Sequence, residues 1–394
     1  MAGGILAGVT VVALEQAVAA PFATRQLADF GARVIKIERP GSGDFARHYD
    51  ETVFGESSHF VWINRGKESL TLNLKTESGQ TVFRQLLKRA DVLVQNLKPG
   101  SLEKMGLDRE TLQQEFPALI VCNISGYGPD GPEFRKKAYD LLIQAESGLL
   151  SITGTAETPV KVGVSIADIA AGMYAYTGIL LALIQRFQSH QGTVIDISML
   201  EALAEWMGYP LNYGHFSGHP PARTGAHHAT IAPYGPYRVA GGAEVFLGIQ
   251  NEREWALFCQ DVLEAPDLAD DARFQNNSLR VANRAALNAA IDGVFSRMDQ
   301  KDVLARLDEA GIAYARLNSV EDLWNHPQLR ARERWKPVST PGGMIEALLP
   351  PVNFSGTEPL MGDVPKLGAH TDAILQELGF HSGAIDEWHN DGVV

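Results

Sequence analysis

The sequence is poor in cysteine, has no excess of basic residues and contains no apolar run long enough to span a membrane. Cys122 and Cys259 are the only cysteines in 394 residues and lack metal-ligand spacing, so we expect a reducing compartment and no disulfide framework. The formal net charge of −13 at pH 7 argues against nucleic acid as the main partner. The apolar stretch 169–184 is too short to cross a bilayer comfortably and is predicted to be a buried helix. The N-terminus lacks the positive segment of a secretion signal, and we expect a cytoplasmic protein with no membrane partner.

The chain also lacks the motifs of two common cofactor sites. Residues 14–21 read LEQAVAAP, without the glycines of a G-x-G-x-x-G turn that let a pyrophosphate approach the backbone. A nicotinamide or flavin enzyme is therefore not expected. Four histidines lie close together at 215, 219, 227 and 228, but not at a recognised ligand spacing. We expect neither a metal site nor a prosthetic group.

Strand and helix patterns alternate through the first half of the chain. The length of 394 residues exceeds what one core usually serves, so about two domains are expected. Strand patterns at 8–14, 33–38, 69–74, 91–96 and 118–126 alternate with helical patterns at 20–31 and 79–90. Such alternation predicts an α/β fold with a doubly wound, mostly parallel, Rossmann-like sheet.

The amino-acid composition of the sequence changes after residue 207. Glycine, proline, tyrosine and histidine are frequent at 208–236, and a hairpin pattern surrounds Gly241 and Gly242. We place a second, smaller α+β domain at 225–325. Residues 1–224 then form the N-terminal part of the large domain, and 326–394 return to it. Helical patterns in the smaller domain cover 251–263, 283–298 and 300–311.

One carboxylate, Asp168, lies near the start of the run VGVSIADIAAGMYAYTGILLAL (162–183). No other charge follows it until Arg186. Ser165 stands three residues earlier, so the pair resembles a Ser-x-x-acid box that caps a helix. The helix dipole favours an anion at the same place. Local sequence therefore favours a capping role for Asp168, and a catalytic role is the alternative.

Seven segments of the chain stand in the order typical of one enzyme family. They read FATRQLADFGARVIKIERPGSGD, NRGKESLTLNLKTESG, ADVLVQNLKPGSLEKMGLD, ISGYGPDGP, AYDLLIQAESGLLSITG, VGVSIADIAAGMYAYTGILLAL and LGAHTDAILQELG. Together they resemble the class III coenzyme A transferases, the family that includes formyl-CoA:oxalate CoA-transferase. The likeness runs from about residue 8 to the C-terminus. It implies a homodimer in which two ring-like chains interlock.

The resemblance implies that Asp168 is the catalytic nucleophile. In the family, attack of this carboxylate on the donor thioester gives an aspartyl acyl anhydride, and the released CoA thiolate then forms an aspartyl-CoA thioester. The incoming acid takes CoA through a second anhydride. A helix N-terminus would keep Asp168 ionised and offer free N–H groups to oxyanions. Capping and catalysis by Asp168 are therefore compatible.

Two other functions remain as alternatives. The related α-methylacyl-CoA racemases share the fold but remove and return an α-proton, using a histidine in a GHD motif. The corresponding residues here read AYD, with Tyr139 at the histidine position, and a phenol of pKa about 10 is a poor base near neutral pH. A non-catalytic acyl-CoA-binding protein is the third possibility. The intact segment around Asp168 argues against it.

The resemblance also implies that a coenzyme A thioester is a substrate. Its phosphates need cations or free N–H groups, and Arg39 and Lys104 are the best candidates for them. The alternative for each lysine, taken singly, is a solvated surface side chain that binds no phosphate. By family position the CoA contacts are Val18, Ala19, Arg39, Leu72, Lys75, Asn96, Leu97, Lys98, Lys104, Lys137, Ala138, Tyr139 and Asp140.

The acid that accepts CoA is predicted from the segment RTGAHHATIAPYG (223–235). The glycine-rich lid of formyl-CoA:oxalate CoA-transferase is missing here. The segment is more similar to family members that use succinyl-CoA and a C4–C6 dicarboxylate such as citramalate, itaconate, mesaconate or glutarate. Arg223, His227 and His228 would then hold the free carboxylate. The alternative is that all three are loop residues with ordinary hydrogen bonds.

Overall fold

The computed structural model describes residues 4–394, which form two units. The first comprises the chain up to Ser147 together with Val162–Met207 and Gln328–Val394. The second comprises Gly148–Lys161 and Gly208–Pro327. Each unit is described by itself.

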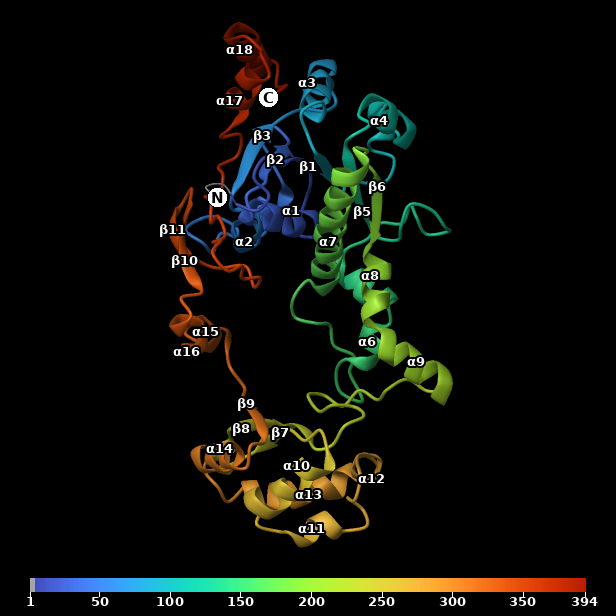
Figure 1. Ribbon diagram of the computed structural model, residues 1–394, viewed down its shortest axis with the longest axis vertical. Helices are drawn as coiled ribbons and strands as arrows, with labels where there is room; N and C mark the ends of the chain where they lie inside the picture. The colour runs from blue at the N-terminus through green and yellow to red at the C-terminus, as the bar shows by residue number, and fades with distance from the viewer. Residues whose placement is uncertain (1–3) are drawn as a thin grey trace. The chain divides into compact units, whose positions relative to one another are not determined.

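A six-stranded parallel sheet is the centre of the first unit (Figure 1). Its order is β3-β2-β1-β4-β5-β6, and every neighbouring pair is parallel. The order reverses between β1 and β4, which is where doubly wound sheets bind ligands at the carboxyl ends of the strands. The expected doubly wound sheet is confirmed. The strands are β1 (Thr10–Leu14), β2 (Arg33–Glu38), β3 (Lys67–Thr71), β4 (Val92–Gln95), β5 (Ile120–Ser125) and β6 (Val194–Ser198).

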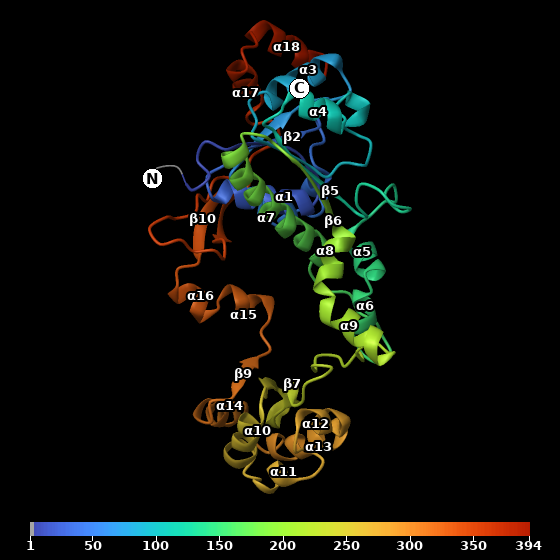
Figure 2. The same cartoon turned by 45° about the vertical axis from the view of Figure 1, so that its right-hand side comes forward.

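Helices cover both faces of this sheet. Helices α1 (Ala19–Asp29) and α7 (Ile166–Ser189) pack closely on each other, as Figure 2 shows. Helices α3 (Glu77–Leu87), α4 (Arg109–Glu115), α17 (Thr371–Glu377) and α18 (Ser382–Asn390) share another hydrophobic cluster with the strands. Burial on both faces explains why the central strands read as continuous apolar runs rather than alternating ones.

Helix α7 is buried along only one of its faces. Ala171, Ala175 and Ile179 are fully buried, but Ile184 and Phe187 are 61% and 85% exposed. The expectation of a buried helix therefore holds for one face only, because apolar composition does not show how many faces a neighbouring element covers. The expectation that this apolar stretch is too short to span a bilayer is wrong, because α7 is 24 residues long and could cross a membrane by length and composition. In the structure its buried face packs against α1, β5 and β6.

The first unit contains a hairpin that the sequence patterns did not predict. Strands β10 (Trp335–Thr340) and β11 (Gly343–Leu348) pair antiparallel, and Val338 packs with Phe60 and Val61 in a small cluster. The other elements are η1 (Phe45–His48), α2 (Ser58–Asn64), η2 (Glu103–Met105), α5 (Asp140–Glu146) and α8 (Met199–Trp206). Helix α16 (Pro327–Ala331) begins at the unit boundary.

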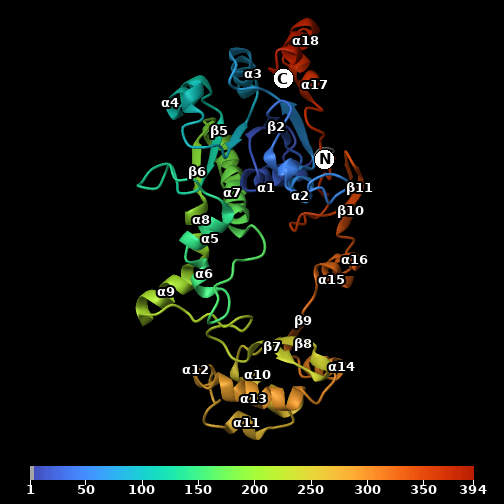
Figure 3. The same cartoon turned by 180° about the vertical axis from the view of Figure 1, so that it is seen from behind.

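The second unit is a small antiparallel sheet packed with helices (Figure 3). Strands β7 (Tyr234–Arg238), β8 (Glu244–Gly248) and β9 (Ala313–Arg316) form the sheet. Buried aromatic side chains of Tyr237, Trp255, Phe258 and Phe295 contribute to its core. The helices are α6 (Leu149–Ile152), α9 (Gly208–Ser217), α10 (Glu252–Leu257), η4 (Phe258–Val262), α11 (Asp267–Asp270), α12 (Asn277–Ala282), α13 (Arg284–Phe295), α14 (Gln300–Glu309) and α15 (Val320–Trp324), with a short η3 (Ala240–Gly242) between β7 and β8. The expected smaller α+β domain is present.

The boundaries of the units differ from the expected division at 1–224, 225–325 and 326–394. The second unit begins at residue 208 rather than 225, and it also includes 148–161. Hydrogen bonds from Arg223 to the backbone oxygens of Thr155 and Ala156, both 2.8 Å long, tie these two segments together. Such a tie joins residues far apart in sequence, so local composition does not reveal it.

Candidate functional site

The carboxylate of Asp168 lies in the first turn of α7. Ser165 is the N-cap residue but makes no side-chain capping hydrogen bond. Instead, Asp140 Oδ1 accepts from the backbone N–H of Ala167 at 2.7 Å and of Asp168 at 3.4 Å. The expected Ser-x-x-acid box is therefore wrong. Ser165 has φ −72° and ψ 70°, which is not the extended conformation of a capping residue.

Asp140 approaches α7 from the start of α5. Its second oxygen, Oδ2, accepts a 2.7 Å hydrogen bond from Gln144, which holds the carboxylate in place. The carboxyl group of Asp140 thus caps α7 from a different helix. Its effect on Asp168 is electrostatic as well as structural.

The pKa of Asp168 is raised to about 7, first by burial and second by the negative charge of Asp140. The sequence suggests the opposite direction, because a free helix N-terminus favours an anion. In the structure the charge of Asp140 already occupies that position. Asp168 is therefore a carboxyl group that changes its charge near neutral pH.

Tyr49 is a neighbour of Asp168 that the sequence patterns did not identify. It follows η1, and its pKa is raised to about 12 by burial, then by the charges of Asp44 and Asp168 and by Tyr139. Tyr49 therefore lies within electrostatic reach of Asp168. The only sequence signal was its place five residues after the Gly-Asp pair that follows the second strand.

The first turn of α1 packs directly beside the first turns of α7. Gly172 lies so close to α1 that a Cβ atom there would be 2.7 Å from the carbonyl oxygen of Ala19. Val18 is the N-cap of α1 and Ala19 its first residue, and both are buried.

The turn before α1 is held by side chains from two other strand ends. Asn96 exchanges two hydrogen bonds of 2.9 Å with the backbone N–H and C=O of Gln16. Asp44 Oδ1 accepts from the N–H of Ala17 at 3.1 Å. Ala17 has a positive φ of 60°, which is uncommon for a residue other than glycine.

The predicted phosphate-binding cations follow the carboxyl ends of successive strands. Arg39 follows β2, Lys75 follows β3 and Lys98 follows β4, and all three are exposed. Lys104 in η2 and Lys137 before α5 are exposed as well. Leu72, by contrast, is buried. Arg39, Lys75 and Lys98 thus follow the carboxyl ends of strands in the parallel sheet, the edge at which an anionic ligand is expected.

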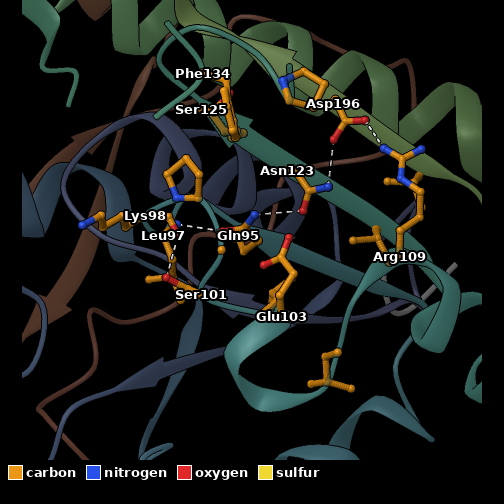
Figure 4. A pocket seen from close by; sticks show the side chains of 18 of the residues that line it. Gln95, Leu97, Lys98, Ser101, Glu103, Arg109, Asn123, Ser125, Phe134 and Asp196 are labelled. Atoms are coloured by element: carbon orange, nitrogen blue, oxygen red, sulfur yellow. Dashed lines mark hydrogen bonds and ion pairs between the residues drawn. The ribbon is translucent and has the colours of Figure 1, made fainter. Parts of the chain in front are cut away.

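A cavity of about 740 Å³ lies beside this edge (Figure 4). Gln95, Asn123 and Asp196 form its row of polar groups, because they are register partners on β4, β5 and β6. Asn123 accepts from Gln95 and donates to Asp196, both at 2.9 Å, and Arg109 pairs with Asp196. Leu97, Lys98 and Lys104, three of the predicted CoA contacts, line the cavity, whereas Asp168 does not.

Arg223, His227 and His228 lie in the second unit and have partners there. The guanidinium of Arg223 donates to backbone oxygens of 151–156. His227 packs edge-on against Tyr237, and His228 stacks on Tyr234 with ring centroids 5.3 Å apart. Burial lowers the pKa of both histidines, which disfavours their cationic forms. These contacts fit the ordinary loop alternative, and contact with a substrate stays a prediction.

Among residues 4–394, no group of three or more histidine, cysteine or acidic side chains is arranged to hold a metal ion.

The fold and the sequence segments define an enzyme that handles coenzyme A thioesters. CoA-transferase family III matches residues 6–371, and the chain belongs to this family. It is 35% identical to a succinyl-CoA:glutarate CoA-transferase of Mus musculus over 99% of this chain and 90% of the relative. It is 33% identical to a succinyl-CoA:mesaconate CoA-transferase of Haloarcula marismortui, covering 96% of this chain and 98% of the relative.

Solved structures agree with this assignment. The chain resembles a CAIB/BAIF family protein from Brucella suis with a TM-score of 0.83 and 34% identity, covering 95% of this chain and all of the other. It also resembles a hypothetical protein from Mycobacterium tuberculosis with a TM-score of 0.84 and 26% identity, covering 95% of this chain and 99% of the other.

Proposed function

We propose that this enzyme transfers CoA from succinyl-CoA to a C4–C6 dicarboxylic acid, such as glutarate, mesaconate, citramalate or itaconate. The observation that carries the proposal is the likeness, over nearly the whole chain, to succinyl-CoA-dependent transferases. Besides the mouse and Haloarcula enzymes, a succinyl-CoA–D-citramalate CoA-transferase of Chloroflexus aurantiacus is 32% identical over 94% of this chain. The acceptors named for these relatives are dicarboxylates.

Asp168 is the proposed nucleophile. Its carboxylate attacks the thioester carbonyl of succinyl-CoA, the C–S bond breaks, and a mixed anhydride and the CoA thiolate result. The thiolate attacks the aspartyl carbonyl, which releases succinate and leaves an aspartyl-CoA thioester. The acceptor carboxylate repeats these two steps in reverse order and regenerates Asp168. No net proton is consumed.

The surroundings of Asp168 set the conditions for this chemistry. Attack requires the ionised carboxylate, and the pKa of about 7 makes that form increasingly populated above neutral pH. The α7 amides of Ala167 and Asp168 already donate to Asp140, so the oxyanions must be stabilised by other groups. Tyr49, whose pKa is raised in part by the charge of Asp168, carries a hydroxyl group within electrostatic reach of it and is the proposed donor.

Coenzyme A enters this scheme as a substrate, and we propose that no metal ion or prosthetic group takes part. Arg39, Lys75, Lys98, Lys104 and Lys137 are the proposed partners of its phosphates. The exposure of all five, and the position of Arg39, Lys75 and Lys98 after the carboxyl ends of strands, support the assignment. Asn96 contributes indirectly, because it holds the Gln16 backbone.

We also propose a cytoplasmic, interlocked homodimer that binds neither nucleic acid nor membrane. Exposed apolar side chains on α7, including Leu181 at 63% and Phe187 at 85% exposure, support a protein partner. The first unit is built from three chain segments, between which the chain leaves and returns. Such a path is what an interlocking chain requires.

A D2O experiment distinguishes this proposal from its alternatives. The protein is incubated in D2O with succinyl-CoA and a panel of free mono- and dicarboxylic acids, and the CoA esters are analysed by mass spectrometry. A new dicarboxylate CoA ester without α-deuterium is expected. Deuterated succinyl-CoA without a new ester would show racemase-type proton exchange instead. If the protein binds succinyl-CoA but neither forms a new CoA ester nor introduces deuterium into succinyl-CoA, it is a non-catalytic binding protein.

A further inference from the structure

Four charged side chains form a continuous buried series beneath the first turn of α1. We call Glu15, Lys36, Asp44 and Lys67 the ion chain. Lys67 Nζ lies 2.6 Å and Lys36 Nζ 3.3 Å from Glu15 Oε1, and Lys36 Nζ lies 2.8 Å from Asp44 Oδ2. All four side chains have no exposed surface. Positive and negative charges alternate, so none is left without a partner.

One end of the ion chain holds the turn that leads into α1. Asp44 Oδ1 accepts from the N–H of Ala17 at 3.1 Å and of Ala46 at 2.9 Å. The first bond secures Ala17 in its left-handed conformation, with φ 60°, which costs free energy for a residue with a side chain. The second bond caps η1, after which Tyr49 follows.

The other end of the ion chain holds the first turns of α1 itself. Lys67 Nζ donates to the carbonyl oxygen of Pro21 at 3.1 Å and to Asn64 Oδ1 at 3.0 Å. Glu15 Oε2 accepts from the hydroxyl of Thr24 at 2.6 Å. Backbone and side-chain groups of α1 are therefore fixed to the end of β1 and to β3. The same first turn of α1 packs against Gly172, which lies four residues after Asp168 on α7.

The ion chain is not explained by stability. Moving four charges out of water is costly, and buried ion pairs can often be replaced by apolar side chains without loss of stability. Burial lowers the pKa of Lys67 to about 7, because a low-dielectric interior disfavours the charged ammonium. The charged groups fix geometry instead, because each hydrogen bond holds one particular atom of the turn or of α1 in place.

We propose that the ion chain is a positioning device for the CoA site. It holds Ala17, Val18 and Ala19 in the arrangement that meets the thioester end of CoA beside Asp168. Glu15, Lys36, Asp44 and Lys67 are positioning residues and touch no substrate. This inference rests on the proposed function, because it takes the β1–α1 turn to be a CoA contact.

A charge-balanced double variant tests the proposal. Glu15→Gln with Lys67→Met removes one charge of each sign and leaves the pair of Lys36 and Asp44 intact. The KM for succinyl-CoA and the Kd for CoA, measured by calorimetry, are expected to rise about tenfold, with a melting temperature close to that of the wild type. The matched control is Asp29→Asn with Arg65→Met, which removes one buried charge of each sign at the other end of α1 and leaves Arg25 without the carboxylate that it pairs with. The control is expected to change the melting temperature but not the KM or Kd.

The outcomes separate this inference from the proposed function. If the wild type transfers CoA and the double variant, folded by circular dichroism, keeps the wild-type KM and Kd, the positioning role is wrong. Equal increases of KM and Kd in the two double variants would also overturn the positioning role, because the loss of any buried ion pair would then have the same effect. If the wild type binds CoA but transfers it to no acid, the proposed function fails alone, and the Kd comparison still decides the positioning role. If the wild type does not bind CoA, both proposals fail.

Discussion

Two carboxyl groups meet at the N-terminus of α7, and they have different tasks. Asp140 accepts from the helix amides at 2.7 and 3.4 Å, so its charge is well compensated. Asp168 lies beside it and has no ion-pair partner within residues 4–394, and its pKa is raised to about 7. A buried carboxyl group with a raised pKa beside a second carboxylate is typical of sites where one acid reacts and the other supports it.

Replacing Asp140 by asparagine should shift the pH dependence of catalysis. The amide oxygen of the new side chain can still accept from the α7 amides, but the negative charge that helps to raise the pKa of Asp168 is gone. In the wild type, kcat/KM should rise with pH through about 7, because the ionised carboxylate attacks. In Asp140→Asn the rise should move about one pH unit lower. A profile with the wild-type midpoint would show that the Asp140 charge has no effect on the nucleophile.

Replacing Asp168 by asparagine should stabilise the protein while abolishing CoA transfer. The folded pKa of about 7 lies above the ordinary value of 3.8, so between these values the folded state binds more protons and stability falls as pH rises. Asparagine does not ionise, so the stability of the variant does not fall with pH for this reason. Its melting temperature should exceed that of the wild type by roughly 2–6 °C at pH 8 and by little at pH 4. Equal melting temperatures at pH 8, measured by calorimetry, would contradict the raised pKa.

Residue roles were predictable where a sequence segment carries them and not where a distant residue decides them. Asp168 stood out as a lone charge at the start of an apolar run. The residue that caps α7 did not stand out, because Asp140 lies 28 residues before Asp168 in the sequence. It caps the helix in place of the nearby Ser165. Tyr49 was missed because a single loop aromatic has no periodic pattern.

At the scale of elements, the close packing of α1 on α7 brings the first turn of α1 against Gly172, four residues after Asp168. Gly172 permits this approach, since a Cβ atom there would meet the Ala19 carbonyl oxygen at 2.7 Å and Phe22 at 3.0 Å. Gly178 on the same helix has more room, with the nearest atom of Ile195 3.3 Å away. The two glycines therefore provide a matched comparison.

Gly172→Ala should displace the first turn of α1, whereas Gly178→Ala should be tolerated. We expect Gly172→Ala to destabilise the protein by about 1–3 kcal/mol and to lower kcat/KM at least tenfold at a temperature where it is folded. Gly178→Ala should change stability by less than about 1 kcal/mol, because alanine favours the helix. Denaturant unfolding and steady-state kinetics measure both effects. Similar behaviour of the two variants would contradict the role of this packing.

The central strands were predictable as elements, and the sheet margin was less so. β1 and β4 are buried on both faces and read as apolar runs. The strand expected at 69–74 begins instead at Lys67, because Lys67 and Ser69 are buried through polar contacts that an apolar pattern does not reveal. The β10–β11 hairpin was missed because it is half-exposed and carries charged residues.

At the scale of the whole molecule, the exposed apolar face of α7 predicts a dimer. Light scattering should give twice the chain mass of 42.8 kDa at micromolar concentration. Phe187→Glu, on the exposed face of α7, should shift the mass toward one chain, because a charge is costly in a desolvated interface. A wild-type mass of 42.8 kDa at all concentrations would contradict the dimer.

The most direct test of the central claim is the intact mass of the protein after mixing with succinyl-CoA and rapid quenching in acid. If Asp168 carries CoA covalently, the wild type should gain the mass of one CoA less one water, and peptide mapping should place it on the segment containing Asp168. Added glutarate or mesaconate should remove it, and Asp168→Ala should never form it. A wild type that turns over without this adduct, or an adduct that persists in Asp168→Ala, would contradict the account.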